Sequence, residues 1–156
     1  MTPAVVMAKK ANIPFELHQF EHDPNASSYG DEVVSALGVD ACQVFKTLVV
    51  QMDNGKLAVG IVPVNQQLDL KAMASALKAK KVAMANKNKV MQSSGYVLGG
   101  VSPIGQKKLL QTLLHHSAAQ WPQIYVSAGK RGLEILLSPA DLLSLTRGEF
   151  GDIAKG

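Results

Sequence analysis

The chain has 156 residues, of which 47% are hydrophobic and 18% charged, so it can bury a core and is not a disordered chain. Its single cysteine, Cys42, excludes an internal disulfide, and no set of Cys and His has zinc-site spacing, so we predict no metal and no cofactor. No apolar run is long enough to cross a bilayer, and the N-terminus does not resemble a signal peptide. We therefore expect a cytoplasmic protein with no membrane segment.

The charges are distributed unevenly. Between Asp69 and Glu134 there is no acidic residue, yet this stretch holds ten of the sixteen Lys and Arg. It therefore carries +10, whereas the flanks carry −6, and the two together give the net +4 of the chain. A stretch of one sign attracts polyanions, and phosphate backbones are common polyanions.

Helices are predicted where a capping residue precedes apolar residues at helical spacing. Thr2 and Pro3 have this pattern, as do Asp69 and Ser138, and Gly38 marks the end of a short helix. The expected helices are residues 3–10, 30–37 and 69–78, a helix that starts at Ser138, and a polar helix or turn up to Ser94.

Strands are predicted from alternating or continuous apolar runs. The clearest pair surrounds Asp53-Asn54-Gly55, because Asn-Gly supplies the positive φ angles of a tight hairpin. The expected strands are residues 15–20, 45–52, 56–64, 81–85, 124–127 and 133–137, with Ala128 to Gly132 as a second hairpin turn. Residues 107–120 fit either a helix or a buried strand. Hairpins mixed with helices indicate one α/β (α+β) domain over residues 1–156 with a mixed, largely antiparallel sheet.

Two features could carry chemistry. The stretch from Gly95 to Gly105 is rich in glycine, and its main-chain N–H groups could form an anion or oxyanion cradle, although the loop taken alone favours a structural turn or bulge. Lys46 places a charge at the start of the most apolar strand, either as a lysine that extends to solvent or as a cation aimed at a phosphate or a developing negative charge.

The remaining polar residues do not suggest a nucleophile or a metal site. On a strand, His18 and His22 would lie about 13 Å apart, too far to share an ion. His115 and His116 are expected on opposite sides of a regular element. Cys42 has no evident base, and Gly-x-Ser-x-Gly is absent. If the protein cleaves an ester, the attacking group should belong to the substrate or to water.

Several motifs then occur in one order along the chain. They are Met-Thr-Pro-Ala at residues 1–4, His-Asp-Pro at 22–24, Phe-Lys-Thr-Leu at 45–48, Leu-Asp-Leu-Lys at 68–71, the glycine loop with its two lysines at 95–108, Ile-Tyr-Val-Ser at 124–127 and Gly-Lys-Arg-Gly at 129–132. Together they resemble, essentially end to end, the YbaK family of Cys-tRNA(Pro) deacylases, which is related to the editing domain inserted in bacterial prolyl-tRNA synthetases.

The resemblance implies a free-standing enzyme with a compact, barrel-like mixed sheet flanked by helices. It places the essential lysine at Lys46 and a Gly-x-x-x-Pro loop at residues 99–103, and it implies attack by the thiol of the substrate on its own ester, with a cyclic thiolactone as product. It also implies aminoacyl-tRNA as substrate and prolyl-tRNA synthetase as a partner.

The catalytic residues expected on this basis are Lys46, Gly99 and Gly100. The expected substrate-binding residues are Phe20, Thr47, Ser102, Pro103, Ser127, Gly129 and Glu134. The expected tRNA-binding residues are Lys78, Lys80, Lys81, Lys107, Lys108, Lys130 and Arg131.

Three positions depart from the family pattern. Phe20 stands where a Tyr is expected, Ala128 where a Gly is usual, and Glu134 where the shorter Asp is common. Each departure bears on the choice of substrate rather than on the fold. Two alternatives therefore stay open: a deacylase of Ala-tRNA(Pro), and a non-catalytic protein that binds tRNA or a synthetase.

Overall fold

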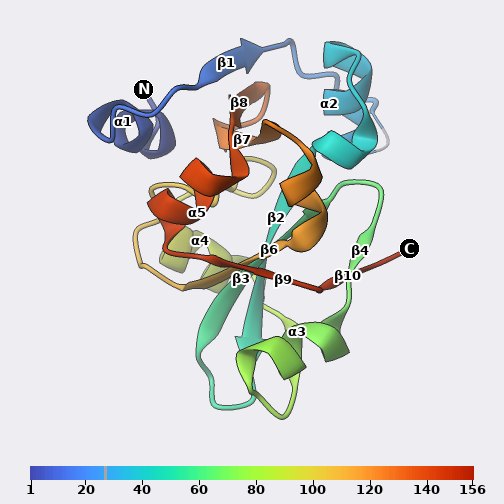
Figure 1. Cartoon of the computed structure of the whole chain (residues 1–156), viewed down its shortest axis with the longest axis vertical. Helices are drawn as coiled ribbons and strands as arrows, with labels where there is room; N and C mark the ends of the chain where they lie inside the picture. The colour runs from blue at the N-terminus through green and yellow to red at the C-terminus, as the bar shows by residue number, and fades with distance from the viewer. Residues whose placement is uncertain (27) are drawn as a thin grey trace.

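The computed structural model describes residues 1–26 and 28–156. Its helices are α1 (Pro3–Lys10), α2 (Tyr29–Leu37), α3 (Leu70–Leu77), α4 (Lys87–Ser94) and α5 (Pro139–Thr146), with short 3-10 helices at Ala41–Gln43 and His116–Gln120. Its strands are β1 (Glu16–Gln19), β2 (Phe45–Met52), β3 (Leu57–Pro63), β4 (Gln67–Leu68), β5 (Val82–Met84), β6 (Gln111–His115), β7 (Ile124–Lys130), β8 (Leu133–Leu137), β9 (Glu149–Gly151) and β10 (Ala154–Lys155). Figure 1 shows their arrangement. None of the described helices could span a membrane.

The largest sheet has five strands in the order β5-β2-β3-β6-β9. The expected hairpin of β2 and β3 forms its centre, and Gly55 in the turn has a φ of 87°, as the Asn-Gly signal predicted. β5 is antiparallel to β2, whereas β6 and β9 run parallel to their neighbours. The sheet is therefore mixed.

Two smaller antiparallel sheets, β1-β8-β7 and β4-β10, complete the strands. An isolated bridge between Val44 and Tyr125 brings β7 next to the start of β2. The predicted α/β class with a mixed, largely antiparallel sheet is thus confirmed. The barrel-like closure is not: among the described residues the strands stay in three separate sheets.

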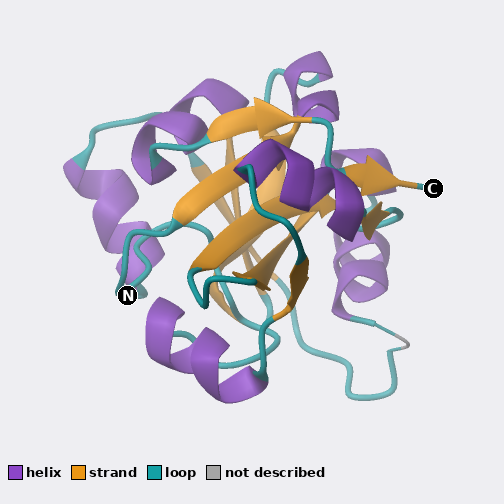
Figure 2. Cartoon of the chain, turned by 90° about the horizontal axis from the view of Figure 1, so that it is seen from below, coloured by secondary structure: helices purple, strands orange, loops and turns teal. Residues whose placement is uncertain are grey.

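Both faces of the central hairpin are buried, which explains its nearly continuous apolar sequence. On one face Val49, Val59 and Ile61 pack in a core that includes Val90 of α4. On the other face Val50, Ala58 and Val62 pack with Met73 and Leu77 of α3. Figure 2 shows helices on both sides of the strands.

Residues 107–120 contain a strand, β6, and not a helix over their whole length. Successive side chains of β6 point to opposite faces, as expected for a strand. Leu113 packs in the core that contains Met73 of α3, and Leu114 packs in the core that contains Val90 of α4. The second hairpin also differs from its prediction. Strand β7 continues through Ala128 and Gly129 to Lys130, with an irregularity between Ser127 and Lys130, so the turn is shorter than expected.

Asp69→Ala should lower the free energy of unfolding by about 1 kcal/mol, because the Asp69 carboxylate accepts the Ala72 N–H at the start of α3. Urea unfolding measures this difference. Ser75→Ala is the matched control, since Ser75 is exposed on the same helix and its side chain makes no cap. An equal loss in both variants would contradict the capping role.

Candidate functional site

A cavity of about 420 Å³ opens beside the first half of β2. β5 pairs with β2 only from Val50 to Met52, and the last bond between them joins the Ala85 N–H to the Val49 carbonyl. The preceding part of β2 therefore has no β5 partner, and the cavity lies along this edge. Its walls come from β2, α2, the end of β5, the start of α4, the glycine loop, Ser127 and Glu134.

Lys46 lines this cavity as a half-buried cation. Burial lowers the pKa of its ammonium group, because a low-dielectric environment disfavours charge. Among the described residues no carboxylate lies within ion-pair distance of it. An ammonium group that is partly desolvated and unpaired favours an anion or a developing negative charge.

Glu134 lies at the cavity wall and is only 2% exposed. The Tyr29 hydroxyl donates to its Oε2 over 3.3 Å and accepts the Gly132 N–H over 2.9 Å. Burial raises the pKa of Glu134 to about 8, although the hydrogen bond from Tyr29 acts in the opposite direction. The Glu134 carboxyl is therefore mostly protonated in the empty cavity at neutral pH.

Thr47 also lines the cavity, and its Oγ1 is buried without a hydrogen-bond partner among the described residues. A buried hydroxyl left unpaired costs about 1–3 kcal/mol, so such groups usually have a ligand or a water to bind. Ser127 lines the cavity too, and its Oγ accepts the Gly129 N–H over 3.1 Å. Both residues were expected at a substrate site.

The glycine loop contributes Gly99 but not Gly100 to the cavity wall. Residues 97–100 form a turn in which Gly99 has a φ of 86° and the Gly100 N–H donates to the Val97 carbonyl over 3.0 Å. Because that N–H is already engaged, the oxyanion-binding role expected for Gly100 is not supported.

Ser102 and Pro103, which were expected to bind substrate, do not line the cavity. Both are buried, and the Ser102 hydroxyl accepts the Ile104 N–H over 3.2 Å. They hold the shape of the loop from inside. Gly129 on β7 does not line the cavity either, and an added Cβ there would lie 2.7 Å from the Tyr96 ring. Phe20 stacks on Tyr29 at a ring-centroid distance of 6.0 Å, one layer behind the cavity.

Arg131, expected to contact tRNA, is exposed beside the glycine loop and does not line the cavity. Its guanidinium lies 5.7 Å from the centroid of the Tyr29 ring, and its Nη1 donates to His22 Nε2 over 3.1 Å. The Nδ1 of His22 in turn lies 2.9 Å from the carboxylate of Glu32. An added Cβ on Gly99 would lie 2.2 Å from Arg131 Nε, so Gly99 is the residue that lets the guanidinium fit.

No local pattern in the sequence predicts this chain of contacts from Glu32 to Arg131. His22 was noted for its spacing from His18 and as part of the His-Asp-Pro motif, but its partners lie far away along the chain.

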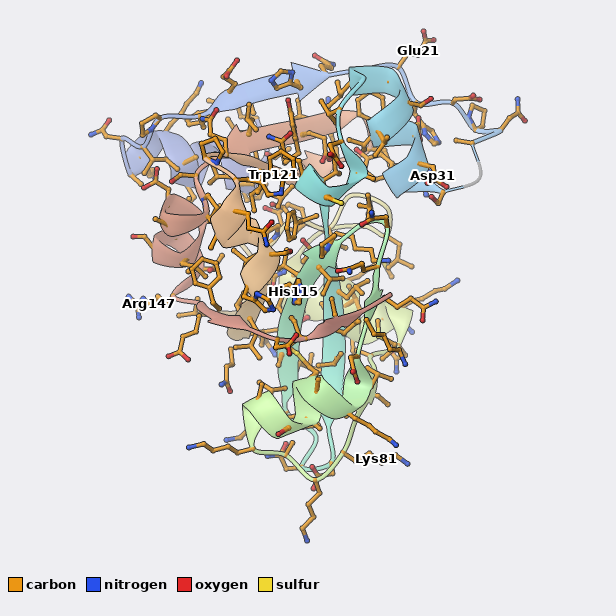
Figure 3. The ribbon with its side chains drawn as sticks, turned by 45° about the vertical axis from the view of Figure 1, so that its right-hand side comes forward. Glu21, Asp31, Lys81, His115, Trp121 and Arg147 are labelled. Atoms are coloured by element: carbon orange, nitrogen blue, oxygen red, sulfur yellow. The ribbon has the colours of Figure 1, made fainter. Side chains whose placement is uncertain are left out.

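None of the other lysines expected to bind tRNA lines the cavity. They are exposed in three places: Lys78, Lys80 and Lys81 around the connection from α3 to β5, Lys107 and Lys108 beside the C-terminal end of α4, and Lys130 at the end of β7. Figure 3 shows Lys81 at one end of the molecule and the acidic residues Glu21 and Asp31 at the other. The separation is not complete in space, because the Asp53 carboxylate accepts the Lys80 N–H and Arg131 bonds to His22 beside Glu32.

His115, His116 and Asp152 form a second group of polar side chains, with candidate ligand atoms within 4.8 Å of one another. The expectation that the two histidines face opposite sides was wrong, because β6 ends at His115 and a 3-10 helix begins at His116, which brings their ring centroids to 4.4 Å. However, His115 Nδ1 accepts the Ile153 N–H, so Nε2 of the neutral ring carries the proton. We therefore assign no metal to this group.

Taken together, the fold and the cavity define a small α/β domain that can hold an anionic or ester ligand. The model of the aminoacyl-tRNA editing domain matches residues 23–145. The chain therefore belongs to the aminoacyl-tRNA editing domain family, which confirms the resemblance seen in the sequence.

The chain is 40% identical over 152 residues to a protein of Enterococcus faecalis named "Putative Cys-tRNA(Pro)/Cys-tRNA(Cys) deacylase EbsC", covering 97% of this chain and 92% of that protein. It is 36% identical over 77 residues to a proline–tRNA ligase of Shouchella clausii, which covers 49% of this chain and 13% of the ligase. A crystal structure described as "a putative trans-editing enzyme for prolyl tRNA synthetase" has the same fold, with a TM-score of 0.85 at 21% identity over 99% of this chain and 96% of that one.

Glu134→Gln should change how stability depends on pH. Between about pH 5 and 8 the folded protein keeps a proton on Glu134 that the unfolded chain has released, so the stability of the wild type falls as pH rises through this range. The glutamine variant lacks this titration. Urea unfolding gives the free energy of unfolding of both proteins. The value for the variant minus that for the wild type should increase as pH rises from about 5 to 8, and should be constant below and above this range. A difference that does not change with pH would contradict the burial argument.

Gly99→Ala should destabilise the protein more than Gly38→Ala, as measured by urea unfolding. Both positions have positive φ, which costs alanine about 1 kcal/mol. At Gly38 nothing lies within 4 Å of an added Cβ, whereas at Gly99 the Arg131 guanidinium must move. Equal losses of unfolding free energy in the two variants would mean that the contact between Arg131 and Gly99 does not contribute to stability.

Proposed function

We propose that the chain is a trans-editing deacylase that removes cysteine from mischarged tRNA(Pro). The observation that carries this proposal is the composition of the cavity: an unpaired, half-buried Lys46 faces the same space as the buried carboxyl of Glu134 and the turn at Gly99. Membership of the editing-domain family and the name of the Enterococcus faecalis relative support the same substrate class.

The cavity lining contains no cysteine and no histidine. Cys42 lies outside it, exposed and near the Asn65 amide. A protein nucleophile needs a free hydroxyl or thiol with a partner base within hydrogen-bond reach. Among the described residues the Thr47 hydroxyl has no hydrogen-bond partner, and the Tyr29 hydroxyl is already hydrogen-bonded to Glu134. We infer from the family resemblance that the attacking group is the thiol of the substrate's own cysteine, with water as the alternative.

In this step the thiol sulfur forms a bond to the ester carbonyl carbon, and the bond from that carbon to the ribose oxygen breaks. The thiol proton ends on the ribose hydroxyl, and cysteine leaves as a cyclic thiolactone. Because both reacting groups are in one molecule, the cavity accelerates the step mainly by holding them close together.

Each residue at the wall has a role in this reaction. The Lys46 ammonium stabilises the negative charge that develops on the ester carbonyl oxygen, and Gly99, which lines the cavity, offers a main-chain N–H to the same oxygen. Glu134 receives the α-ammonium group of the substrate, whose positive charge lowers the pKa of the carboxyl so that its proton passes to solvent. The free Thr47 hydroxyl and Ser127 bind the terminal ribose.

The rest of the chain serves delivery of the substrate. We infer that residues 1–156 act as one editing domain in the cytoplasm and that the basic side of the molecule contacts the tRNA backbone without reading its sequence. The sequence contains no evident module specific for one tRNA, so we infer that selection of tRNA(Pro) falls to a partner. Prolyl-tRNA synthetase is that partner, which agrees with the chain's similarity to a segment of a proline–tRNA ligase.

Lys46→Ala should slow the single-turnover release of cysteine from Cys-tRNA(Pro) by at least about 100-fold, because it removes a cation beside the developing charge. The wild-type reaction should yield the cyclic thiolactone and should leave Ala-tRNA(Pro) intact, since alanine has no thiol. Lys71→Ala, an exposed lysine on α3, is the control and should react like the wild type.

Two results would contradict the proposal in different ways. Release of alanine at the rate of cysteine would make water the attacking group and the protein an Ala-tRNA(Pro) deacylase. Release of neither amino acid above the spontaneous rate would make it a non-catalytic tRNA-binding protein.

A further inference from the structure

A second cavity, of about 510 Å³, lies on the opposite side of α4 from the candidate site. We refer to it as the lysine groove, defined by Lys56, Lys89 and Lys108. These lysines come from three separate segments, namely the end of the β2–β3 turn, α4, and the loop before β6. The fold therefore brings them together, and their sequence positions do not predict it.

The lysine groove carries one sign of charge. No acidic residue lines it, and within the described part of the chain none of its three ammonium groups forms an ion pair. Like charges around one concave surface repel each other and concentrate field lines in the groove, which favours an anion that spans it.

The helix α4 connects the lysine groove to the candidate site. Lys87 and Val90 of this helix line the candidate site, whereas Lys89 and Gln92 line the groove. With its side chains an α-helix is about 10–12 Å across, so a polymer that leaves one cavity reaches the other within a few nucleotides. The helix contains no acidic residue that would repel it.

The other groove residues suit a polynucleotide better than an acidic protein segment. Gln92 and Gln111 offer amide donors for phosphate and ribose oxygens, and Leu109 is 63% exposed and offers an apolar face for a ribose or a base. An exposed leucine beside three cations has no partner in the described chain that would cover it.

We propose that the lysine groove binds the phosphate backbone of the RNA whose aminoacylated 3′ end occupies the candidate site. This inference rests on the proposed function, since it takes its RNA from there. It adds Lys56, which lies outside the basic stretch between Asp69 and Glu134, to the RNA interface. It also groups Lys89 with Lys56 and Lys108 rather than with Lys78, Lys80 and Lys81 at the connection from α3 to β5.

The test compares two triple variants that remove the same charge. The groove variant, Lys56→Gln/Lys89→Gln/Lys108→Gln, removes the three positive charges of the lysine groove. The control variant, Lys10→Gln/Lys71→Gln/Lys155→Gln, removes three exposed lysines that line neither cavity. The probe is a fluorescently labelled RNA hairpin with an acceptor-type stem and a single-stranded 3′ end that carries no amino acid. Fluorescence anisotropy gives the affinity across a series of salt concentrations, and thermal melting verifies that each variant is folded.

The groove variant should bind the hairpin at least roughly tenfold more weakly than the control variant. Its slope of log affinity against log salt should be smaller in magnitude by about one for each lysine that contacts a phosphate. Equal affinities and slopes in the two variants overturn the proposal. So does a groove variant that keeps its affinity for the RNA but loses binding to a polyglutamate peptide, since the groove would then hold an acidic protein segment.

The hairpin carries no amino acid, so this experiment is independent of ester cleavage. A wild type that deacylates Cys-tRNA(Pro) while both triple variants bind RNA equally would leave the proposed function standing and remove the groove from it. Weaker RNA binding by the groove variant alone, in a protein that cleaves no ester, would keep the groove as an RNA site and remove the proposed function.

Discussion

The short pairing between β5 and β2 is the constraint on which the rest of the site depends. A central strand with a full-length neighbour on each side would leave no room for a ligand, because its N–H and C=O groups would all be used in the sheet. Here β5 covers only the last part of β2, and α2, α4 and the glycine loop surround the part that remains open. The rigid hairpin therefore holds Lys46 and Thr47 at a cavity wall without itself being exposed on either face.

The electrostatics of the cavity depend on keeping one charge and suppressing another. If Glu134 were ionised in the empty cavity, its carboxylate would attract Lys46 and compete with an anionic ligand. Burial keeps the carboxyl mostly neutral, although the hydrogen bond from Tyr29 acts in the opposite direction, so the ammonium group stays available. A substrate that brings its own ammonium group could then ionise Glu134, which couples recognition of the amino acid to the charge of the site. The longer side chain of Glu, in place of the Asp common in the family, bears directly on this contact.

The glycine loop is held in place by a chain of polar contacts that begins at Glu32 and passes through His22 to Arg131. This chain uses the acidic flank to position an element of the basic stretch. Within the described part of the chain Lys56, Lys89 and Lys108 form no ion pair, and α4 separates their groove from the cavity. A carboxylate on α4 would reduce the positive charge of the groove.

The sequence by itself determined the elements with strong local signals. Helix caps and tight turns act within a few residues, so the local sequence can predict them. The helices that begin after Thr2, Asp69 and Ser138, and the hairpin at Asn-Gly, were predicted in this way. The ordered motifs also identified the family and placed Lys46 at the site. Strands β4, β9 and β10 were missed because two or three residues carry no period, and they form only when a distant partner strand is available.

Tertiary structure alone decided which side chains meet. The sequence could not show that the Gly100 N–H is used in its own turn, that Ser102 points inward, or that Arg131 lies against Gly99 and bonds to His22. Nor could it show that Lys56, Lys89 and Lys108 line one groove. The physical reason is the same in each case: long-range contacts depend on how sheets and helices pack, and no local pattern of residues records that packing.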